Sequence, residues 1–348
     1  MRSSRRAILR FALGLALAAV VFAEIVPRIA SYGDVAHRLG TVSWPWILAL
    51  SAGSLVDIAT TALPWQAVLP QLRFIPALAF TQASTALTTL LPGGAPLGMA
   101  LSFGFLRRLR VDRGQAAFAV ALTGIWSQVM ILVYPLIGAI LVFATGDLSS
   151  STAVIAGVSA VGGALIVGLA VAVLRSERAA RWLGDFAARV AAKVARLFHR
   201  DPPDWSGEAL VRVRAEQLVL LRRRWGRLTA ATLGNQLSAY LVFELCLRAV
   251  GISFAELPPS EAFLAWAIGR VLTSLPLTPG GIGVVELGMI GTLVGFGASH
   301  SHVVAAVLLY RGVIVVPTLV IGLLALPMLR RLAGAPLEVP IELPVDPE

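Results

Sequence analysis

Apolar residues in this chain fall in long continuous blocks, and polar residues gather between the blocks. Six blocks are long enough to cross about 30 Å of hydrocarbon as helices. They cover residues 8–26, 46–63, 116–144, 153–174, 228–250 and 303–329. Continuous blocks of this length, without the spacing of an amphipathic surface helix, predict six transmembrane helices.

Two further apolar stretches, residues 75–106 and 262–297, are each interrupted near the middle by Pro-Gly-Gly. Proline and glycine disfavour a continuous helix, so each stretch is expected to form two short helices. Such a pair either enters and leaves on one side as a re-entrant hairpin or makes two full crossings. Both alternatives add an even number of passes. We expect an all-α polytopic integral membrane protein with two broken, re-entrant helix pairs beside the six spans.

The composition excludes the soluble classes. Of 348 residues, 57% are hydrophobic and 14% are charged, whereas soluble domains carry about 25% charged residues. The single cysteine, Cys246, rules out an intramolecular disulfide and a multi-cysteine zinc site. A net charge of +10 in a soluble protein would suggest nucleic acid, but here the positive residues flank the apolar blocks. We therefore expect no nucleic-acid partner.

The positions of Lys and Arg predict the orientation, because these residues stay on the cytoplasmic side in short loops. With the amino terminus inside, the cytoplasmic segments contain most of the 29 Lys and Arg residues, and thirteen of them lie at 175–227. The outer loops, at about 27–45, 145–152 and 251–261, contain only Arg28 and Arg38. We expect a protein of the bacterial inner membrane with both termini in the cytoplasm. The alternative for residues 1–26 is a cleaved signal peptide, which would leave the later topology unchanged.

An internal repeat is predicted when the chain is aligned with itself so that Pro92 falls on Pro279. This gap-free alignment, which we call the repeat alignment, also places Asp57 on Glu244 and the span that begins near residue 116 on the span that begins near residue 303. The first unit, about 41–145, starts outside, and the second unit, about 228–330, starts inside. Inverted repeats with broken helices are the architecture of many secondary transporters.

The transmembrane region, residues 1–330, is interpreted as one domain with a polar insert at about 175–227. In this insert an apolar stripe that includes Trp182, Phe186 and Val190 runs beside a basic face. Such a helix either lies on anionic lipid or covers the cytoplasmic helix ends. A second mixed helix is expected at about 208–225, and residues 331–348 are expected to form a disordered tail.

The strongest chemical signal is the second break, Leu275 to Glu286, followed by Tyr310-Arg311. Non-helical backbone is tolerated at membrane depth only where protein or a watery cavity surrounds it. Pro279 suits the first turn of a new helix, whose free N–H groups favour an anion. Glu286 lies in an apolar segment and needs a partner, for which Arg311 and Arg270 are the candidates.

Two interpretations of these charges remain open. In the first, a Glu286–Arg311 bridge only locks two helices together. In the second, which we favour, one arginine holds a lipid phosphate while Glu286 tunes it or carries a proton. The remaining substrate-binding candidates are three glycines of the second break, the residues of the first break, and one acid from each half. They are Gly280, Gly281, Gly283, Pro92, Gly93, Gly94, Asp57 and Glu244.

Some candidates have simpler explanations. Arg248 lies one helical turn after Glu244 and could neutralise it. His300 and His302 lack a third ligand for a metal site. The sequence therefore predicts no metal and no cofactor.

The pattern P-x-x-P-G-G-x-G-x-x-E, followed about twenty-five residues later by an aromatic residue and an arginine, resembles the lysylphosphatidylglycerol synthase transmembrane region family. This family includes the flippase-like membrane half of the multiple peptide resistance factor. The resemblance covers roughly residues 8–330. Its motif residues are Pro276, Pro279, Gly280, Gly281, Gly283, Glu286 and Arg311. In the first half the chain has Leu97-Gly98-Met99 where the family usually shows an acid. The soluble synthase domain is not expected here.

The resemblance implies a lipid flippase or transporter that moves anionic or aminoacylated phospholipid, or a polyprenyl-linked substrate, between leaflets. One alternative is a membrane-embedded transferase that acts on a lipid carrier, with Glu286 as general base. The other is an accessory membrane subunit that binds a soluble glycosyl or aminoacyl transferase through residues 175–227. The sequence does not specify the lipid, the direction, the energy coupling or the oligomeric state.

Overall fold

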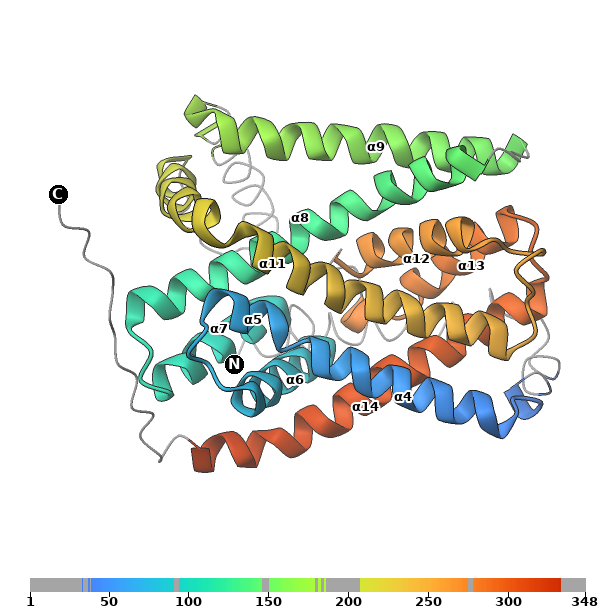
Figure 1. The fold of residues 1–348 in the computed structure, drawn as a ribbon, viewed down its shortest axis with the longest axis horizontal. Coiled ribbons are helices and arrows are strands. Elements are labelled where there is room, and N and C mark those ends of the chain that lie inside the picture. Colours follow the sequence, from blue (N-terminus) through green and yellow to red (C-terminus); the bar gives the residue numbers. More distant parts are fainter. Residues whose placement is uncertain are drawn as a thin grey trace, which may run out of the picture.

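The computed structural model describes residues 39–90, 94–145, 150–178, 207–274 and 278–332, together with positions 33, 37, 181, 182 and 185. Within these residues the regular structure is helical, and no strand is present (Figure 1). The helices are α4 (Trp44–Thr60), α5 (Leu63–Val68), α6 (Phe74–Leu90), α7 (Gly94–Arg108), α8 (Arg113–Thr145), α9 (Ser150–Arg175), α11 (Gly207–Ala249), α12 (Pro259–Ser274), the 3₁₀ turn η2 (Pro279–Gly281), α13 (Val284–Gly295) and α14 (His300–Leu332). The all-helical prediction is confirmed.

Three helical segments of the described chain are long and apolar enough to cross a membrane: Trp44–Val68, Gln115–Thr145 and His300–Ala325. They contain most of the predicted spans 46–63, 116–144 and 303–329. The predicted spans 153–174 and 228–250 lie in α9 and in the second half of α11, while 8–26 lies outside the described residues. One row on α9 is more than half exposed, as expected of a lipid-facing surface. It consists of Val154, Val158, Val161 and Leu165.

The polar insert differs from its prediction at its end. A separate surface helix was expected at about 208–225, but α11 runs without a break from Gly207 to Ala249. This segment contains no proline, and Gly226 at the predicted junction weakens a helix without ending it. Most of the predicted amphipathic stripe and the tail after residue 332 lie outside the described residues.

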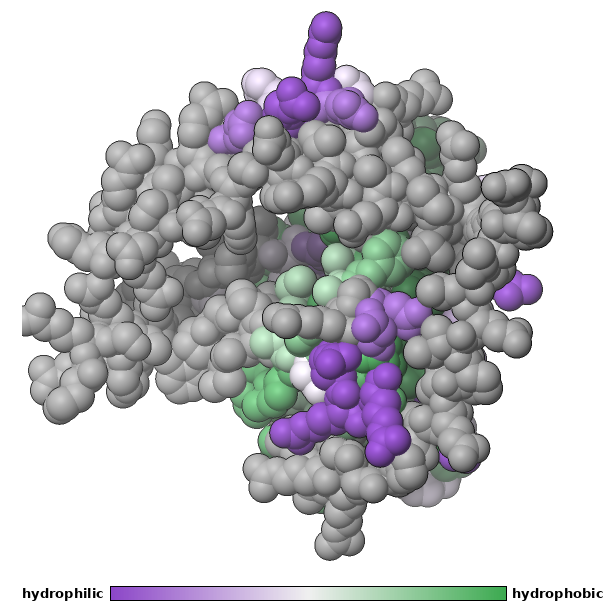
Figure 2. Space-filling view, turned by 90° about the vertical axis from the view of Figure 1, so that its left-hand side faces the viewer, coloured by the Kyte–Doolittle hydropathy of each residue, from purple (hydrophilic) through white to green (hydrophobic). Residues whose placement is uncertain are grey.

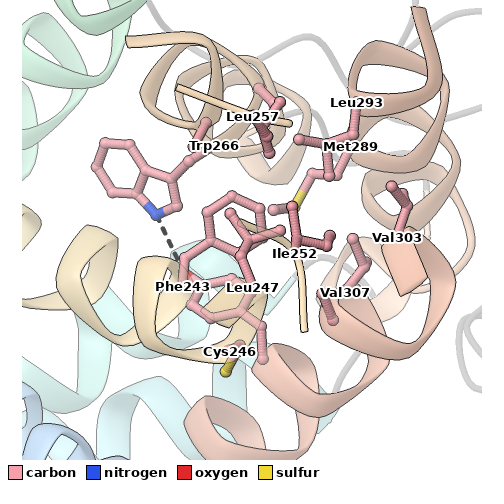
Figure 3. Packing of buried hydrophobic residues seen from close by; sticks show 14 of the residues in the cluster. Phe243, Cys246, Leu247, Ile252, Leu257, Trp266, Met289, Leu293, Val303 and Val307 are labelled. Carbon is pink, nitrogen blue, oxygen red and sulfur yellow. Dashed lines mark hydrogen bonds between the residues drawn. The ribbon is translucent and has the colours of Figure 1, made fainter. Parts of the chain in front are cut away.

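Helices from the two halves of the chain pack against each other rather than forming separate bodies. α4 lies beside α11, α6 packs on α14, and α12 packs on α8 (Figure 1). The largest apolar cluster joins α11, α12, α13 and α14 around Phe243, Trp266 and Met289 (Figure 3). A second cluster joins α5 to α8, where the Trp65 and Phe80 rings meet edge to face. These contacts place the second break, at η2, against α6 and α12 inside one bundle.

Exposed arginines gather where the α5–α6 loop and the α7–α8 turn meet, at the left-hand end of Figure 1. They include Arg73 in that loop, Arg107 and Arg108 at the end of α7, and Arg110 in the turn that follows. Figure 2 looks onto this end and shows hydrophilic side chains beside apolar ones. We call this region the basic end.

Candidate functional site

The second Pro-Gly-Gly break is a short non-helical segment between α12 and α13. Gly280, Gly281 and Gly283 have φ values of 60°, 70° and 88°, a region that side-chain-bearing residues rarely adopt. The Gly281 N–H donates to the Thr278 carbonyl at 3.1 Å. Pro279 begins a 3₁₀ turn, not the first turn of the new α-helix as predicted, because three left-handed residues delay α13 until Val284.

Glu286 lies in the first turn of α13, and its side chain is 3% exposed. Arg311 Nε donates to Glu286 Oε1 at 2.6 Å, and the Gly283 N–H donates to Oε2 at 2.6 Å. A second nitrogen of Arg311 donates to the Gly280 carbonyl at 2.8 Å. Glu286 therefore already occupies the anion position at this helix N-terminus, and the ion pair fastens α14 to both sides of the break.

Arg270, in contrast, has no ion pair with a carboxylate among the residues that the structure describes. It lines a small cavity together with Trp266, Thr273, Tyr310 and Arg311. The cavity has a volume of about 30 Å³, above the roughly 10–15 Å³ needed to hold one water. Arg270 Nε is buried and has no hydrogen-bond partner in the described part of the chain. Buried donors in proteins are normally hydrogen-bonded, so an unbonded one is unusual. This nitrogen is therefore a candidate hydrogen-bond donor to a ligand.

Aromatic side chains surround Arg270, and the sequence analysis identified only Tyr310 among them. The Trp266 indole N–H donates to the Tyr310 hydroxyl at 3.1 Å (dashed in Figure 3). Tyr134 from α8 packs 5.5 Å from the Trp266 ring, and its buried hydroxyl has no partner among the described residues. Trp266 precedes Arg270 by four residues, so helical spacing could have placed them on one face. No local pattern links Tyr134 to this site.

Asp57 brings a second carboxylate to this region from α4. It is 8% exposed and accepts a hydrogen bond of 2.9 Å from the Ser238 hydroxyl of α11. Arg270 acts electrostatically on Asp57, and Tyr310 interacts electrostatically with Asp57, Arg270 and Arg311. The fold thus joins charges from α4, α12, α13 and α14, which are far apart in the sequence.

The other predicted site residues lie elsewhere or outside the described residues. Glu244 accepts a bond of 2.9 Å from Arg248 Nε, the pairing that the sequence also allowed, and Arg248 continues to the carbonyls of Ile252 and Leu257. Pro92 and Gly93 are outside the described residues, and Gly94 begins α7. A Cβ atom at Gly280 would lie 3.2 Å from the Thr89 carbonyl oxygen. The end of α6, just before the first break, therefore touches the second break.

Residues 8–322 match the family described as lysylphosphatidylglycerol synthase TM region. The chain belongs to this family. Among curated proteins, none matches the chain. Together with the three apolar helices described above, membership shows a multi-pass membrane protein that corresponds to the membrane domain of the lysylphosphatidylglycerol synthase family.

Within this family member the two halves differ at the site. The repeat alignment places Glu286 on Met99 and Arg311 on Gly124. Met99 is 50% exposed, and Gly124 has no atom near the position of a Cβ. At these two described positions the first half has no counterpart of the Glu286–Arg311 pair, and Leu97-Gly98-Met99 is also where the chain departs from the family pattern.

Proposed function

We propose that this protein moves lipids with an anionic phosphate between the leaflets of the bacterial inner membrane. The candidate lipids are anionic or aminoacylated phospholipids and polyprenyl-linked substrates. One observation carries the proposal: Arg270 lines a cavity among apolar helices and keeps a buried donor without a partner in the described part of the chain. An ionisable group at membrane depth normally marks a substrate or ion path. The planar guanidinium fork suits phosphate oxygens.

The contacts suggest different tasks for the two arginines. Arg270 is assigned the first contact with the phosphate, because it lines the cavity and its buried Nε donor has no partner in the described part of the chain. Arg311 lines the same cavity, but its Nε and one further nitrogen hold Glu286 and the Gly280 carbonyl. Glu286 therefore orients Arg311, and the proline and glycines of the break provide the backbone shape that this arrangement needs.

An inverted repeat is proposed as the basis of alternating access. The repeat alignment places α8 (Arg113–Thr145) on α14 (His300–Leu332) from end to end. It also places α6 on α12. The packing of α6 on α14 in one half-to-half contact then corresponds to the packing of α12 on α8 in the other. Such reciprocal packing supports two halves related by an axis in the membrane plane.

The lengths of the broken helices support re-entrant pairs. α12 has 16 residues and α13 has 12, so they extend about 24 and 18 Å at 1.5 Å per residue. Both lengths are short of the roughly 30 Å hydrocarbon layer. The basic end supports placing the α5–α6 loop, the α7–α8 turn and both termini in the cytoplasm.

The proposal is tested by leaflet exchange of fluorescent phosphatidylglycerol and of a polyprenyl phosphate in vesicles containing the purified protein. Arg270→Gln is expected to slow exchange roughly 10- to 100-fold, because a charged hydrogen bond contributes about 1.5–3 kcal/mol. The exposed Arg108→Gln is the matched control and is expected to exchange like the wild type. Unchanged exchange in folded Arg270→Gln would refute the assignment of the phosphate to Arg270.

Glu286→Gln and Arg311→Ala are less selective variants of the same site. Each is expected to abolish exchange, but Arg311→Ala also leaves a buried carboxylate unpaired, which costs about 3–5 kcal/mol of stability. Thermal unfolding in detergent separates the two effects. If folded wild-type protein exchanges neither lipid, the translocase proposal is wrong. Covalently altered lipid in the same vesicles would then identify a transferase.

A further inference from the structure

Four ionisable side chains from α4, α12, α13 and α14 lie in one interior region. They are Asp57, Arg270, Glu286 and Arg311, and their formal charges cancel. Arg270 and Arg311 line the same cavity, and Ser54, one helical turn before Asp57, holds α4 on α14 by donating to the Val313 carbonyl at 3.0 Å. Glu286 and Arg311 compensate each other in direct contact. Asp57 and Arg270 compensate each other electrostatically, and no hydrogen bond joins them in the described part of the chain.

An anion at Arg270 disturbs this balance. The cluster would then carry one excess negative charge in an apolar surrounding, where an uncompensated charge is costly and a group tends to neutralise instead. Both oxygens of Glu286 are engaged, so protonating Glu286 would leave Arg311 without its counter-charge. Asp57 has the Ser238 hydroxyl as its side-chain donor, and it can gain a proton without separating an ion pair in contact.

We propose that binding of a lipid phosphate at Arg270 is coupled to the uptake of one proton by Asp57. The inference rests on the proposed function, because it requires an anion at Arg270. One phosphodiester and one proton then enter the site together, and the buried charge stays at zero. By linkage, protonation of Asp57 strengthens lipid binding by the same factor by which the lipid strengthens proton binding.

The surroundings of Asp57 point to this group. The titratable or charged side chains that interact electrostatically with it are Arg270 of α12 and Tyr310 of α14. α11 contributes the Ser238 hydroxyl, and the two charged residues that follow Ser238 on this helix, Glu244 and Arg248, pair with each other. α6 contains no titratable residue between Phe74 and Leu90. When a phosphate binds Arg270, the positive charge of Arg270 therefore no longer compensates the negative charge of Asp57.

A chain of hydroxyl and amide groups leads away from Asp57 along the α4–α11 interface. The Ser238 and Thr60 hydroxyls are 2.9 Å apart, and the Asn235 amide donates to Thr60 at 3.2 Å. Thr60 is one helical turn nearer the basic end than Asp57, because α4 runs towards α5 (Figure 1). Hydroxyl groups donate and accept, so this chain offers a route for the proton from that side.

The test measures protons bound per lipid by calorimetry of purified protein in buffers of different ionisation enthalpy. The probe is short-chain phosphatidylglycerol, a phosphodiester without a second ionisation near neutral pH. The wild type is expected to take up about one proton per lipid and to bind roughly tenfold more weakly per unit rise in pH where Asp57 ionises. Asp57→Asn, which mimics the protonated form, should bind without proton uptake, and Asp57→Glu should restore it. Glu256→Gln, an exposed carboxyl, is the control.

The outcomes separate this inference from the proposed function. Lipid binding by the wild type without proton uptake, or proton uptake that persists in Asp57→Asn, overturns the inference alone. Absence of lipid binding by the wild type overturns both. If Asp57→Asn does not fold, infrared difference spectra of the wild type with an ether-linked phosphatidylglycerol decide the question. A new protonated-carboxyl band is expected on lipid addition, and its absence overturns the inference.

Discussion

Arg110, at the turn after α7, adopts a left-handed conformation with φ of 60°. Such a residue costs about 1–2 kcal/mol unless it is glycine. The repeat alignment places Gly297 at this position in the turn after α13, with φ of 97°. The same hydrogen bond closes both turns, from Val111 N–H to the Leu106 carbonyl and from Ala298 N–H to the Leu293 carbonyl. The first half thus keeps an arginine where glycine fits better, which agrees with a need for positive charge at the basic end.

Replacing this arginine should therefore stabilise the fold. We expect Arg110→Gly to raise the free energy of unfolding by up to about 1 kcal/mol, and Gly297→Ala to lower it by about 1 kcal/mol. Thermal unfolding in one detergent measures both variants. A loss of stability in Arg110→Gly would mean that contacts of the arginine outweigh the backbone strain.

At the site, the sequence predicted the candidate partners of Glu286 but not which arginine pairs with it or which donor stays unbonded. The cost of a charge at membrane depth was enough to assign Arg311 and Arg270 as the candidate partners of Glu286. Which arginine pairs depends on how α12 and α14 cross, and that is set by packing between distant segments. The open Arg270 donor and the Asp57–Ser238 bond therefore became visible only in the structure.

At the scale of elements, α8 and α12 approach closely at Gly138. A Cβ atom there would lie 2.9 Å from the Leu264 Cα atom, a backbone atom that cannot rotate away. Gly124 on the same helix has no such neighbour within 4 Å. We expect Gly138→Ala to lower stability by about 1–3 kcal/mol through overpacking, and Gly124→Ala to be neutral or stabilising. Thermal unfolding of both variants measures the difference, and equal effects would contradict this close approach.

Helix positions were predictable from hydrophobicity because the membrane demands long apolar blocks with internal hydrogen bonds. The segments around 116–144 and 303–329 fall inside α8 and α14. Continuity was less predictable, since α11 crosses from a polar to an apolar sequence without ending. A change in polarity along the chain marks a change of surroundings and does not end a helix. A prediction based on composition therefore placed two helices where the structure has one.

At the scale of the whole molecule, orientation and the inverted repeat can be tested together. Cys246 is the chain's single cysteine and is buried. A thiol reagent is therefore expected to label only a cysteine introduced at an exposed position. Arg108 lies at the basic end, and Ala255 lies in the loop after α11; both are exposed. We expect an impermeant maleimide to label Arg108→Cys only from the cytoplasmic side and Ala255→Cys only from the opposite side.

These two labels constrain the topology because the loops lie on opposite sides only if the chain crosses an odd number of times between them. α8, α9 and the apolar half of α11 provide three crossings, so the proposed spans predict opposite sides. Wild-type protein under the same conditions is the control for Cys246. Labelling of both positions from one side would mean that one of these helices does not cross, and the second half would then repeat the first in the same orientation rather than inverted.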